Sequence, residues 1–483
     1  MHALCRRISE VVSLDSDGNA IEYDGSWCTW GQLASLCGQV AAAVQPGTQT
    51  GILLRNTPAH VASLLGVLSA GGCVVVVNPS RGDDRIRADL AELDLPIVVG
   101  TADDIRMLTT PDDTTTMITI SDVDSPARIR TGVPSNPGPT TVAVRMLTSG
   151  TTGPPKRVDL TYDMLAVSVI GSDFATAPAP TGLSGSVAIV NAPLVHIGGV
   201  YRVLQCVCEA RPFVLLPRFE LTSWAEAVRR YRPKAVSLVP AALRMVLHSD
   251  LGRDDLAGVR AVTSGTAPLS ADDADAFTEK FGIPVLASYA ATEFGGGVAG
   301  WTLADYREHW ESKRGSVGRA SLGAQLRVVS EDGVPVPPGQ TGLLEVKPGQ
   351  LGPGARWVRT TDLARIDADG FLWIIGRADQ AIIRGGFKVL PDDVRAALES
   401  HPAVLGASVV GRPDERLGAT PVAMVELRGT PPVNDAELTE YLRTRLAPYE
   451  IPSAIAIVEA IPRTPSGKAD LTAVRRHFTG RER

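Results

Sequence analysis

A segment rich in hydroxyl side chains and glycine carries the strongest chemical signal in the sequence. It reads Thr148-Ser149-Gly150-Thr151-Thr152-Gly153-Pro154-Pro155-Lys156 and follows an apolar run over residues 142–147. Hydroxyl groups, backbone N–H groups that glycine leaves accessible and one lysine together suit an anionic polyphosphate. A polar surface turn is the alternative, because clusters of Gly, Ser and Thr commonly form turns. The G-x-x-x-x-G-K-[ST] spacing of a Walker A loop is absent from this segment.

The same segment resembles the signature loop of the adenylating (ANL) superfamily of AMP-binding enzymes, which includes acyl-CoA synthetases, firefly-type luciferases and peptide-synthetase adenylation domains. The family usually has glycine after the lysine, whereas this chain has Arg157. The resemblance implies a loop that binds ATP phosphates. Its expected phosphate-binding residues are Thr148, Ser149, Gly150, Thr151, Thr152, Gly153 and Lys156.

Two further segments resemble family motifs that surround the nucleotide. Residues 264–269 resemble the segment that lines the adenine and acyl pockets, which implies binding roles for Gly265, Thr266, Ala267 and Pro268. Residues 288–293 resemble the Tyr-Gly-x-Thr-Glu motif, with Ala290 in place of glycine. We expect this alanine to narrow the acyl pocket. The resemblance implies that Ser288 and Tyr289 contact the nucleotide, that Thr292 holds the α-phosphate and that Glu293 holds Mg²⁺.

The resemblance continues toward the C-terminus, again in the order that the family has. Residues 357–362 resemble Tyr-Arg-Thr-Gly-Asp, with Thr361 in place of glycine, and residues 376–379 resemble the family hinge. This implies that Asp362 and Arg377 bind ribose and that Asp379 is the hinge. Taken singly, such residues are often solvated surface groups. Their joint occurrence in one order favours the family.

Two last motifs would serve the two halves of a reaction. Residues 385–391 resemble the loop that meets the thiol acceptor, with Gly385, Gly386 and Lys388 as its candidate residues. Residues 462–468 resemble the motif that carries the catalytic lysine, here Lys468. In the family, the small C-terminal domain rotates about the hinge between the two half-reactions.

The segment 191–199 resembles the gate of the acyl pocket in acyl-CoA synthetases and contains His196, a candidate catalytic or gating residue. Relatives that activate amino acids carry an aspartate near this position, because a buried ammonium needs a charged partner. The absence of that aspartate favours a fatty, cyclic or aryl acid. A satisfied core histidine is the alternative for His196. Arg202 lies nearby in an otherwise apolar predicted helix and could face either solvent or a polar substrate group.

These motifs predict an AMP-forming acid–thiol ligase that uses ATP, Mg²⁺ and coenzyme A. The carboxylic acid is first converted to an acyl-adenylate with release of pyrophosphate, and the acyl group then passes to the CoA thiol. We expect Lys468 to bridge the acyl carboxylate and the α-phosphate, because the barrier between two anions is largely electrostatic. The alternatives are transfer to a carrier protein or a non-thiol nucleophile, or a nucleotide-binding protein without catalysis.

The elements that must position these residues follow an α/β pattern. Short apolar runs at 51–54, 73–77, 97–99, 187–190, 213–216, 235–239 and 259–262 alternate with helix-period segments. This alternation is typical of βαβ units with a parallel sheet. We predict a large N-terminal domain over residues 1–376 and a small mobile α+β domain over residues 377–483. The N-terminal domain would include a loop-rich connector at 104–141 and, after about residue 315, a β-rich subdomain that could form a barrel.

The small C-terminal domain has a predicted element order of its own. We expect a helix at 391–400, strands at 405–410 and 421–427, a second helix at 435–446 and a last strand at 454–458. Residues 295–300 fit G-x-G-x-x-G but precede no helix of a βαβ unit, so we reject a dinucleotide site there.

The bulk composition narrows the class of protein. The 483 residues carry 47 Lys and Arg against 53 Asp and Glu, for a net charge of −6, and 5% of the residues are aromatic. This balance does not favour a nucleic-acid surface. The six cysteines form no C-x-x-C pair, and Cys206 and Cys208 lie in an apolar run, so we expect these two to be buried thiols. Without a signal-peptide pattern or an apolar run of 18 residues, we expect a cytoplasmic enzyme without a membrane span, a monomer or a homodimer.

Overall fold

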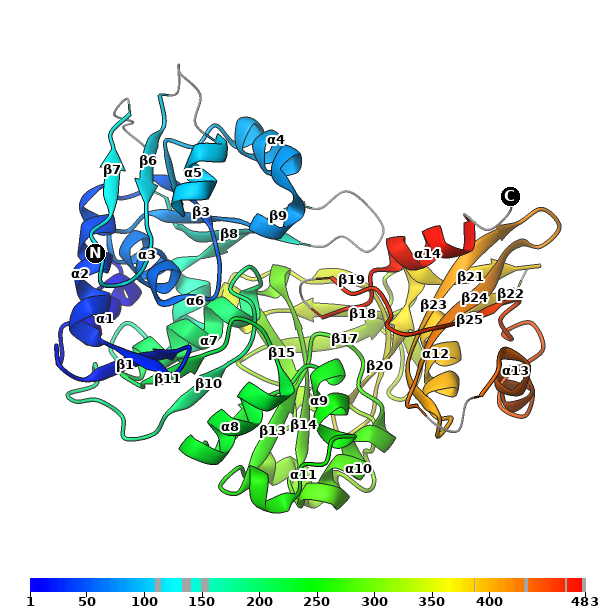
Figure 1. The fold of residues 1–483 in the computed structure, drawn as a ribbon. Coiled ribbons are helices and arrows are strands. Elements are labelled where there is room, and N and C mark those ends of the chain that lie inside the picture. Colours follow the sequence, from blue (N-terminus) through cyan, green and yellow to red (C-terminus); the bar gives the residue numbers. More distant parts are fainter. Residues whose placement is uncertain are drawn as a thin grey trace.

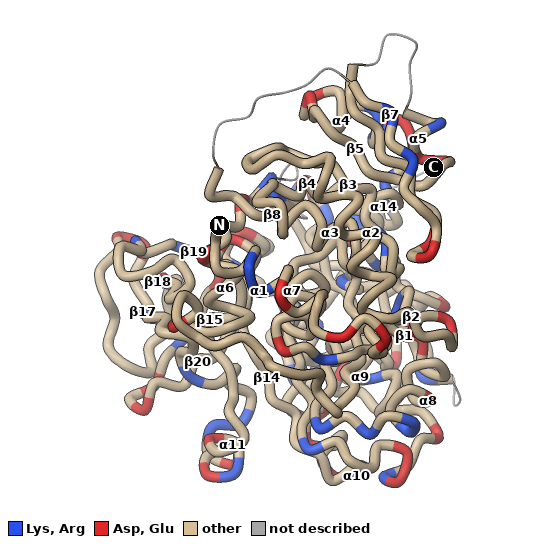
Figure 2. Tube along the Cα trace, turned by 90° about the vertical axis from the view of Figure 1, so that its left-hand side faces the viewer, with Lys and Arg blue, Asp and Glu red and all other residues tan. Residues whose placement is uncertain are grey.

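The computed structural model describes residues 1–108, 114–132, 140–148, 156–385, 387–429, 433–464 and 467–479, with the backbone alone at Thr148 and Lys388. Figure 1 shows several sheet-containing lobes in the N-terminal part of the chain and a separate, smaller C-terminal lobe beside them. Charged residues of both signs are interspersed over the face seen in Figure 2. Within the described residues, no helix has the length and apolar character that crossing a bilayer requires.

A seven-stranded sheet forms the first lobe, in the order β7-β6-β5-β3-β4-β8-β9. Its five inner strands are parallel, and β7 and β9 pair antiparallel at the two edges. The central strands β4 and β5 lack charged and polar side chains, as is typical of a parallel sheet that helices cover on both faces. The strands are β3 (Gln49–Leu53), β4 (Cys73–Val77), β5 (Ile97–Gly100), β6 (Thr116–Thr119), β7 (Arg128–Arg130), β8 (Val142–Thr148) and β9 (Lys156–Thr161).

The predicted loop-rich connector at 104–141 was wrong in part. It contains β6, β7 and most of a short helix, α5 (Ala102–Leu108). The strand β6 forms because Met117 and Ile118 are buried against the neighbouring β5. Such short strands, with few apolar residues each, leave little periodic signal in a sequence.

Helices and a small second sheet complete the first lobe. The sheet has the order β10-β11-β1-β2, and α7 links its parallel strands β10 and β11. All six cysteines are buried free thiols, as predicted for Cys206 and Cys208. The elements are β1 (Asn19–Tyr23), β2 (Ser26–Thr29), β10 (Ala188–Val190), β11 (Phe213–Leu215), α1 (Ala3–Val12), α2 (Trp30–Ala42), α3 (Pro58–Ser69), α4 (Asp83–Leu93), α6 (Tyr162–Val169) and α7 (Ile197–Cys208).

The second lobe is built on a five-stranded sheet in the order β12-β13-β14-β15-β16. The Gly-rich segment at 295–300 lies mainly in β15, which pairs antiparallel with β14, and no helix starts there, in line with the rejected dinucleotide site. The elements are β12 (Ala235–Ser237), β13 (Ala261–Ser264), β14 (Val285–Ala291), β15 (Gly296–Gly300), β16 (Arg319–Ala320), α8 (Leu221–Tyr231), α9 (Pro240–Leu247), α10 (Ala271–Phe281) and α11 (Leu303–His309).

The β-rich region after residue 315 is an open antiparallel sheet, and the barrel suggested for it was wrong. Four strands pair in chain order, β17-β18-β19-β20, and no pairing of β17 with β20 closes the sheet. Four strands are fewer than a filled barrel needs. The strands are β17 (Gln325–Val329), β18 (Thr341–Lys347), β19 (Val358–Ile366) and β20 (Leu372–Arg377).

The C-terminal lobe follows the predicted order of elements, with end points that differ by a few residues. Its sheet runs β22-β21-β24-β23, and β25 pairs parallel with β24. A core that includes Val389, Leu398, Val404 and Leu442 holds it together. The elements are β21 (Ile382–Arg384), β22 (Phe387–Val389), β23 (Val404–Asp414), β24 (Gly418–Leu427), β25 (Ile455–Val458), α12 (Pro391–Glu399), α13 (Asp435–Arg443) and α14 (Leu471–Thr479).

Candidate functional site

Lys468 of the C-terminal lobe lies where this lobe meets the N-terminal lobes, in a region that we call the cleft and that Glu293, Asp362 and Arg377 also border. Backbone hydrogen bonds join the described residues of its loop: Thr464 N–H donates to the Lys468 carbonyl at 2.7 Å, and Gly467 N–H donates to the Thr464 carbonyl at 2.8 Å. Gly467 adopts φ +79°, a conformation that favours glycine. A Cβ atom at Gly467 would lie 3.7 Å from Val239 Cγ2, so the turn rests on the start of α9.

The pKa of the Lys468 ammonium is lowered, first by the protein that surrounds it and then by the charge of Arg377. The carboxylates of Glu293 and Asp362 act in the opposite direction. Lys468 is nevertheless exposed to solvent. The cleft therefore brings together four of the predicted site residues, from three N-terminal elements and the C-terminal loop.

The ends of β14, β19 and β20 form one wall of this cleft. The Tyr289 hydroxyl donates a short hydrogen bond to the Asp362 carboxylate. Asp362 faces Arg377 across the β19–β20 pairing. The Arg377 guanidinium in turn donates to both carboxylate oxygens of Asp379, at 2.9 and 2.7 Å. Burial raises the pKa of Asp362, although the Tyr289 hydroxyl and the Arg377 charge both favour its ionised form.

The turn directly after β14 presents two predicted residues to the cleft. It is the short 3₁₀ helix η3 (Thr292–Phe294), in which Glu293 is exposed and Thr292 is partly buried. The negative charge of Glu293 acts to raise the pKa of both Tyr289 and Lys468, although the net shift at Lys468 is downward. Mg²⁺ in nucleotide sites is usually held by one or two carboxylates together with phosphate oxygens. An exposed carboxylate beside the cleft fits this role.

The segment after β13 approaches β14 closely because it carries a glycine. A Cβ atom at Gly265 would lie 2.8 Å from Ser288 Oγ, closer than real Cβ atoms come. Thr266 adopts φ +72°, which non-glycine residues rarely do and which is common at functional sites. Thr266, Ala267 and Pro268 are exposed. The structure thus brings the predicted residues Gly265 and Ser288 together and leaves the next three residues open to a ligand.

His196 lies at the start of α7, on the side of the cleft where the acid is expected. Its Nε2 atom is buried and has no hydrogen-bond partner among the described residues. Burial, and then the charge of Lys468, lower its pKa to about 4, so the ring is neutral near pH 7. Cβ atoms placed on Gly198, in the first turn of α7, and on Gly297 of β15 would meet no atom within 4 Å, which indicates open space beside both glycines.

Three residues that the sequence analysis missed hold the Gly-rich start of β15 beside this space. The hydroxyls of Ser168 and Tyr201 both donate to the Gly295 carbonyl, the former at 3.0 Å. Gln350 Nε2 donates to the Gly297 carbonyl at 2.6 Å. They come from three separate parts of the chain, so no local pattern could have identified them. Arg202 lies in α7, and its Nη1 donates to Gln205 Oε1 of the same helix at 2.7 Å.

Most of the predicted phosphate loop lies outside the described residues, namely Ser149, Gly150, Thr151, Thr152 and Gly153. Its two ends are described: Thr148 ends β8, and Lys156 starts β9 directly opposite. The loop therefore joins two paired strands at an edge of the seven-stranded sheet. The family-atypical Arg157 forms an ion pair with Asp89 of α4 at 2.6 Å, so it is anchored within the first lobe.

The predicted thiol-acceptor loop is far from the cleft in this structure. Gly385 follows β21 at φ +58°, Gly386 lies outside the described residues and the backbone of Lys388 lies in β22. Figure 1 shows β22 at the outer edge of the C-terminal lobe, away from the N-terminal lobes. The structure thus brings Lys468, but not the thiol-acceptor loop, to the cleft.

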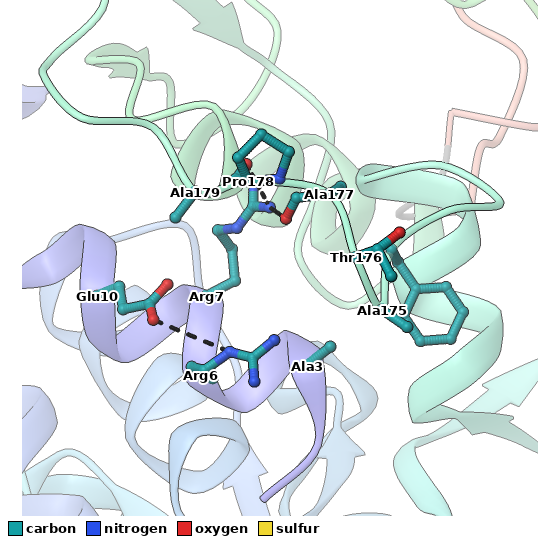
Figure 3. A pocket seen from close by; sticks show the side chains of 10 residues that line it. Ala3, Arg6, Arg7, Glu10, Ala175, Thr176, Ala177, Pro178 and Ala179 are labelled. Atoms are coloured by element: carbon teal, nitrogen blue, oxygen red, sulfur yellow. Dashed lines mark hydrogen bonds and ion pairs between the residues drawn. The ribbon is translucent and has the colours of Figure 1, made fainter.

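A separate cavity of about 330 Å³ lies between α1 and residues 174–179. Figure 3 shows the Arg7 guanidinium pointing at the backbone of this segment, where it donates to the Ala177 and Pro178 carbonyls at 2.8 Å each. Arg6 pairs with Glu10 at 3.9 Å along the same helix. Both arginines of the cavity thus have partners within the protein, and Arg7 ties α1 to the segment 174–179.

Known proteins resemble this chain along nearly its whole length. The model of a family described as AMP-binding enzyme matches residues 9–354, and that of the AMP-binding enzyme C-terminal domain matches residues 393–468. The sulfoacetate–CoA ligase of Cupriavidus necator is 29% identical over 94% of this chain and 93% of its own length. The feruloyl-CoA synthase of an Amycolatopsis species is 29% identical over 95% of this chain and 96% of its own length.

Solved structures show the same fold. The o-succinylbenzoate CoA synthetase of Bacillus subtilis, in complex with its acyl-adenylate intermediate, superposes with a TM-score of 0.77 at 25% identity and covers 98% of this chain and 97% of its own. ATP-bound MatB from Rhodopseudomonas palustris superposes with a TM-score of 0.79 at 22% identity, over 99% of both chains. The second likeness supports the fold alone.

Proposed function

Because the chain belongs to the AMP-binding enzyme family, whose model matches most of its length, we infer that it is an AMP-forming acid–CoA ligase. The enzyme activates a carboxylic acid with ATP to give an acyl-adenylate and pyrophosphate, and then transfers the acyl group to the thiol of coenzyme A. The full-length relatives are CoA ligases by name. The observation that carries the proposal is the position of Lys468, which extends from the C-terminal lobe into the cleft beside Glu293, Asp362 and Arg377.

The first half-reaction joins two anions, the acyl carboxylate and the α-phosphate. Its barrier is therefore mainly electrostatic, and a fixed cation between the two groups is an effective way for a protein to lower that barrier. We propose that Lys468 is that cation, bridging the carboxylate and the α-phosphate while the α-phosphorus–pyrophosphate bond breaks. Thr292 would contact the α-phosphate from the opposite wall. Mg²⁺, when bound at Glu293, neutralises charge on the phosphates and favours the departure of pyrophosphate.

The remaining site residues would bind and orient the nucleotide. We propose that Asp362 and Arg377 bind the ribose and that the Tyr289 ring packs on the adenine, with Gly265 and Ser288 behind it. The hydrogen bond from Tyr289 to Asp362 and the ion pair from Arg377 to Asp379 support this assignment, since both hold a ligand-facing group in place. The loop from Thr148 to Lys156 would bind the β- and γ-phosphates.

The acid is proposed to bind in the open space beside Gly198 and Gly297. His196, neutral and buried, would form its inner wall without adding charge. This environment suits a fatty, cyclic or aryl acid better than an α-amino acid, whose ammonium would need a buried carboxylate. Ala290 would narrow the space compared with the usual glycine.

We propose that the second half-reaction uses a different orientation of the C-terminal domain. With a boundary at residue 376, rotation about Asp379 would withdraw Lys468 and bring the loop of Gly385, Gly386 and Lys388 to the cleft. The outward position of β22 in Figure 1 supports two orientations, because the lysine and the thiol-acceptor loop lie at separate parts of one small domain. Hinges of this kind need only a few residues that change φ and ψ.

A panel of acids tests the function directly. We expect one class of acid to cause pyrophosphate release with ATP and Mg²⁺, and we expect CoA to turn the product from a trapped hydroxamate into a thioester. The panel should contain fatty, cyclic and aryl acids together with sulfonated ones, because relatives of equal similarity are named for ferulate and sulfoacetate. Omission of each acid, of ATP and of Mg²⁺ provides the controls.

The other outcomes of the panel separate the alternatives. Pyrophosphate release that CoA does not redirect would indicate a carrier protein or another nucleophile as the acceptor. ATP binding without release of pyrophosphate, for every acid, would contradict catalysis.

We propose that the enzyme is cytoplasmic, since all six cysteines are free thiols, as in proteins of reducing compartments. We propose that it acts as a monomer or homodimer.

The pH dependence of adenylation should report the environment of Lys468. Its pKa is lowered, so the ammonium is lost at a pH where an ordinary lysine is still charged. We expect kcat/KM for adenylation, which reports groups of the free enzyme, to fall on the alkaline side below the usual lysine range. In Lys468→Arg the residual activity should lack this limb, because arginine stays protonated. An identical limb in that variant would assign the titration to another group.

A further inference from the structure

Three charged side chains form a buried cluster where the C-terminal lobe meets the second N-terminal lobe. Arg244 of α9 donates through Nε to Asp273 Oδ2 of α10 at 2.7 Å. It also donates through Nη1 and Nη2 to the two carboxylate oxygens of Glu399, at the end of α12, at 3.3 and 2.9 Å. The side chains of Arg244, Asp273 and Glu399 are only 10%, 12% and 6% exposed. Figure 1 shows α9 and α10 facing α12 across the junction.

The helix that carries Arg244 also supports the turn of Lys468. Val239 immediately precedes α9 and is the residue against which Gly467 rests. At the other end of α9, His248 Nδ1 lies 3.4 Å from Arg428 Nη1 of the C-terminal lobe. The segment 239–248, which comprises α9 and the residue on either side of it, therefore contacts the C-terminal lobe at three points. Of these three contacts, we expect the bidentate contact of Arg244 with Glu399 to be the strongest, because its hydrogen bonds join two charged groups that are shielded from water.

Each member of this contact keeps a second partner within its own lobe. Arg244 has Asp273, and Glu399 accepts from Arg395 Nη1 at 2.6 Å, one helical turn earlier in α12. Separating the lobes would thus break the contact between Arg244 and Glu399 without leaving either charge unpaired. A buried ion pair that loses one partner normally leaves an uncompensated charge, which is strongly unfavourable. Here that penalty is avoided, so the contact can open and close.

We propose that Arg244 and Glu399 form a reversible interdomain latch that positions the C-terminal domain for adenylation and opens for thioester formation. This inference rests on the proposed two-step function. Only the docked orientation contains the contact, so it shifts the equilibrium toward that orientation by its own interaction free energy. The two internal pairs, Arg244 with Asp273 and Glu399 with Arg395, make the latch releasable. Arg244 and Glu399 act as positioning residues, since neither touches the reacting atoms.

The latch can be tested without any substrate by measuring the distance between the lobes. Spin labels on Glu226→Cys in α8 and Thr472→Cys in α14, both exposed positions, report the docked and undocked populations by pulsed EPR. The six native cysteines are buried. In Glu399→Gln and in Arg244→Lys we expect the ratio of docked to undocked molecules to fall by roughly tenfold, within the usual range of coupling between sites. An unchanged ratio in both variants would overturn the latch.

The control is Glu440→Gln, which removes an exposed C-terminal carboxylate that pairs with Arg443 at 2.8 Å and is 69% exposed. It should leave the distances unchanged. With an acid from the panel, both latch variants should slow adenylation and spare acyl transfer from supplied acyl-adenylate. Arg244→Lys, which keeps the pair of Glu399 with Arg395, should do so at an unaltered melting temperature. Equal loss in both half-reactions would contradict positioning. If no acid of the panel causes pyrophosphate release, the proposed function is refuted. The distance measurement needs no turnover, so it still decides whether the latch exists.

Discussion

Replacing Lys468 by alanine is expected to slow the formation of acyl-adenylate by about 10²- to 10³-fold, the loss typical when one preorganised charge-stabilising group is removed. The charge of Lys468 interacts with the charges of Glu293, Asp362 and Arg377. ATP binding should change little, because the other contacts proposed above for the ribose, the adenine and the phosphates come from residues outside the Lys468 loop. Single-turnover pyrophosphate release measures the first effect, and titration calorimetry with ATP measures the second.

The matched control for this variant is Lys234→Ala, an exposed lysine beside β12. It should have the adenylation rate of the unsubstituted enzyme. Lys468→Ala should also retain acyl transfer when acyl-adenylate is supplied with CoA, because the lysine leaves the cleft for that step in the proposed mechanism. A near-normal adenylation rate in Lys468→Ala would contradict the proposal that Lys468 bridges the carboxylate and the α-phosphate. Loss of ATP binding in this variant would instead indicate that Lys468 serves to bind ATP.

Replacing Asp379 by proline is expected to preserve adenylation and to reduce thioester formation by about 100-fold, since misplacement by about 1 Å costs as much. Asp379 lies in the short 3₁₀ helix η5 (Ala378–Gln380), which directly follows β20. Proline fixes φ near −65°, a value compatible with a 3₁₀ turn, so the docked orientation should survive. The same restriction prevents the change of φ that a rotation about this residue requires.

Asp379→Ala is the control that separates the backbone from the side chain. Both substitutions remove the ion pair between Arg377 and Asp379, but alanine leaves φ free to change. The two variants should therefore adenylate at the same rate, measured by pyrophosphate release, and differ in the rate of acyl-CoA formation from supplied acyl-adenylate. A parallel loss of both half-reactions in the proline variant alone would refute the hinge role and indicate local misfolding.

The latch and the hinge make different contributions to the same motion. The hinge determines whether the C-terminal domain can turn, whereas the contact of Arg244 with Glu399 biases which orientation it occupies. A weakened latch should therefore slow adenylation first, and a stiffened hinge should block the thioester step first. The opposite effects on the two half-reactions provide an internal check, because general destabilisation of the fold would affect both.

The sequence by itself determined the parts of this protein that depend on local patterns. The alternation of apolar strands and helices predicted the α/β lobes, and the periodicity after residue 390 predicted the order of elements in the C-terminal lobe, because side-chain spacing reports the buried face of each element. The motifs at 288–293 and 462–468 identified Tyr289, Glu293 and Lys468 as candidates, since their residue types carry the chemistry. Weakly periodic pieces such as β6 escaped prediction for the same reason.

Only the tertiary structure decided which of these residues meet. It brought Lys468 to Glu293 and Asp362, and it kept β22 outside the cleft. It also joined Arg244 to Glu399 across 155 positions of the sequence, a contact between two unremarkable surface-type residues. Such contacts depend on how lobes pack and on which charges become buried together. A sequence pattern reflects each residue's near neighbours along the chain, so it identifies the reacting groups but not the contacts that position them.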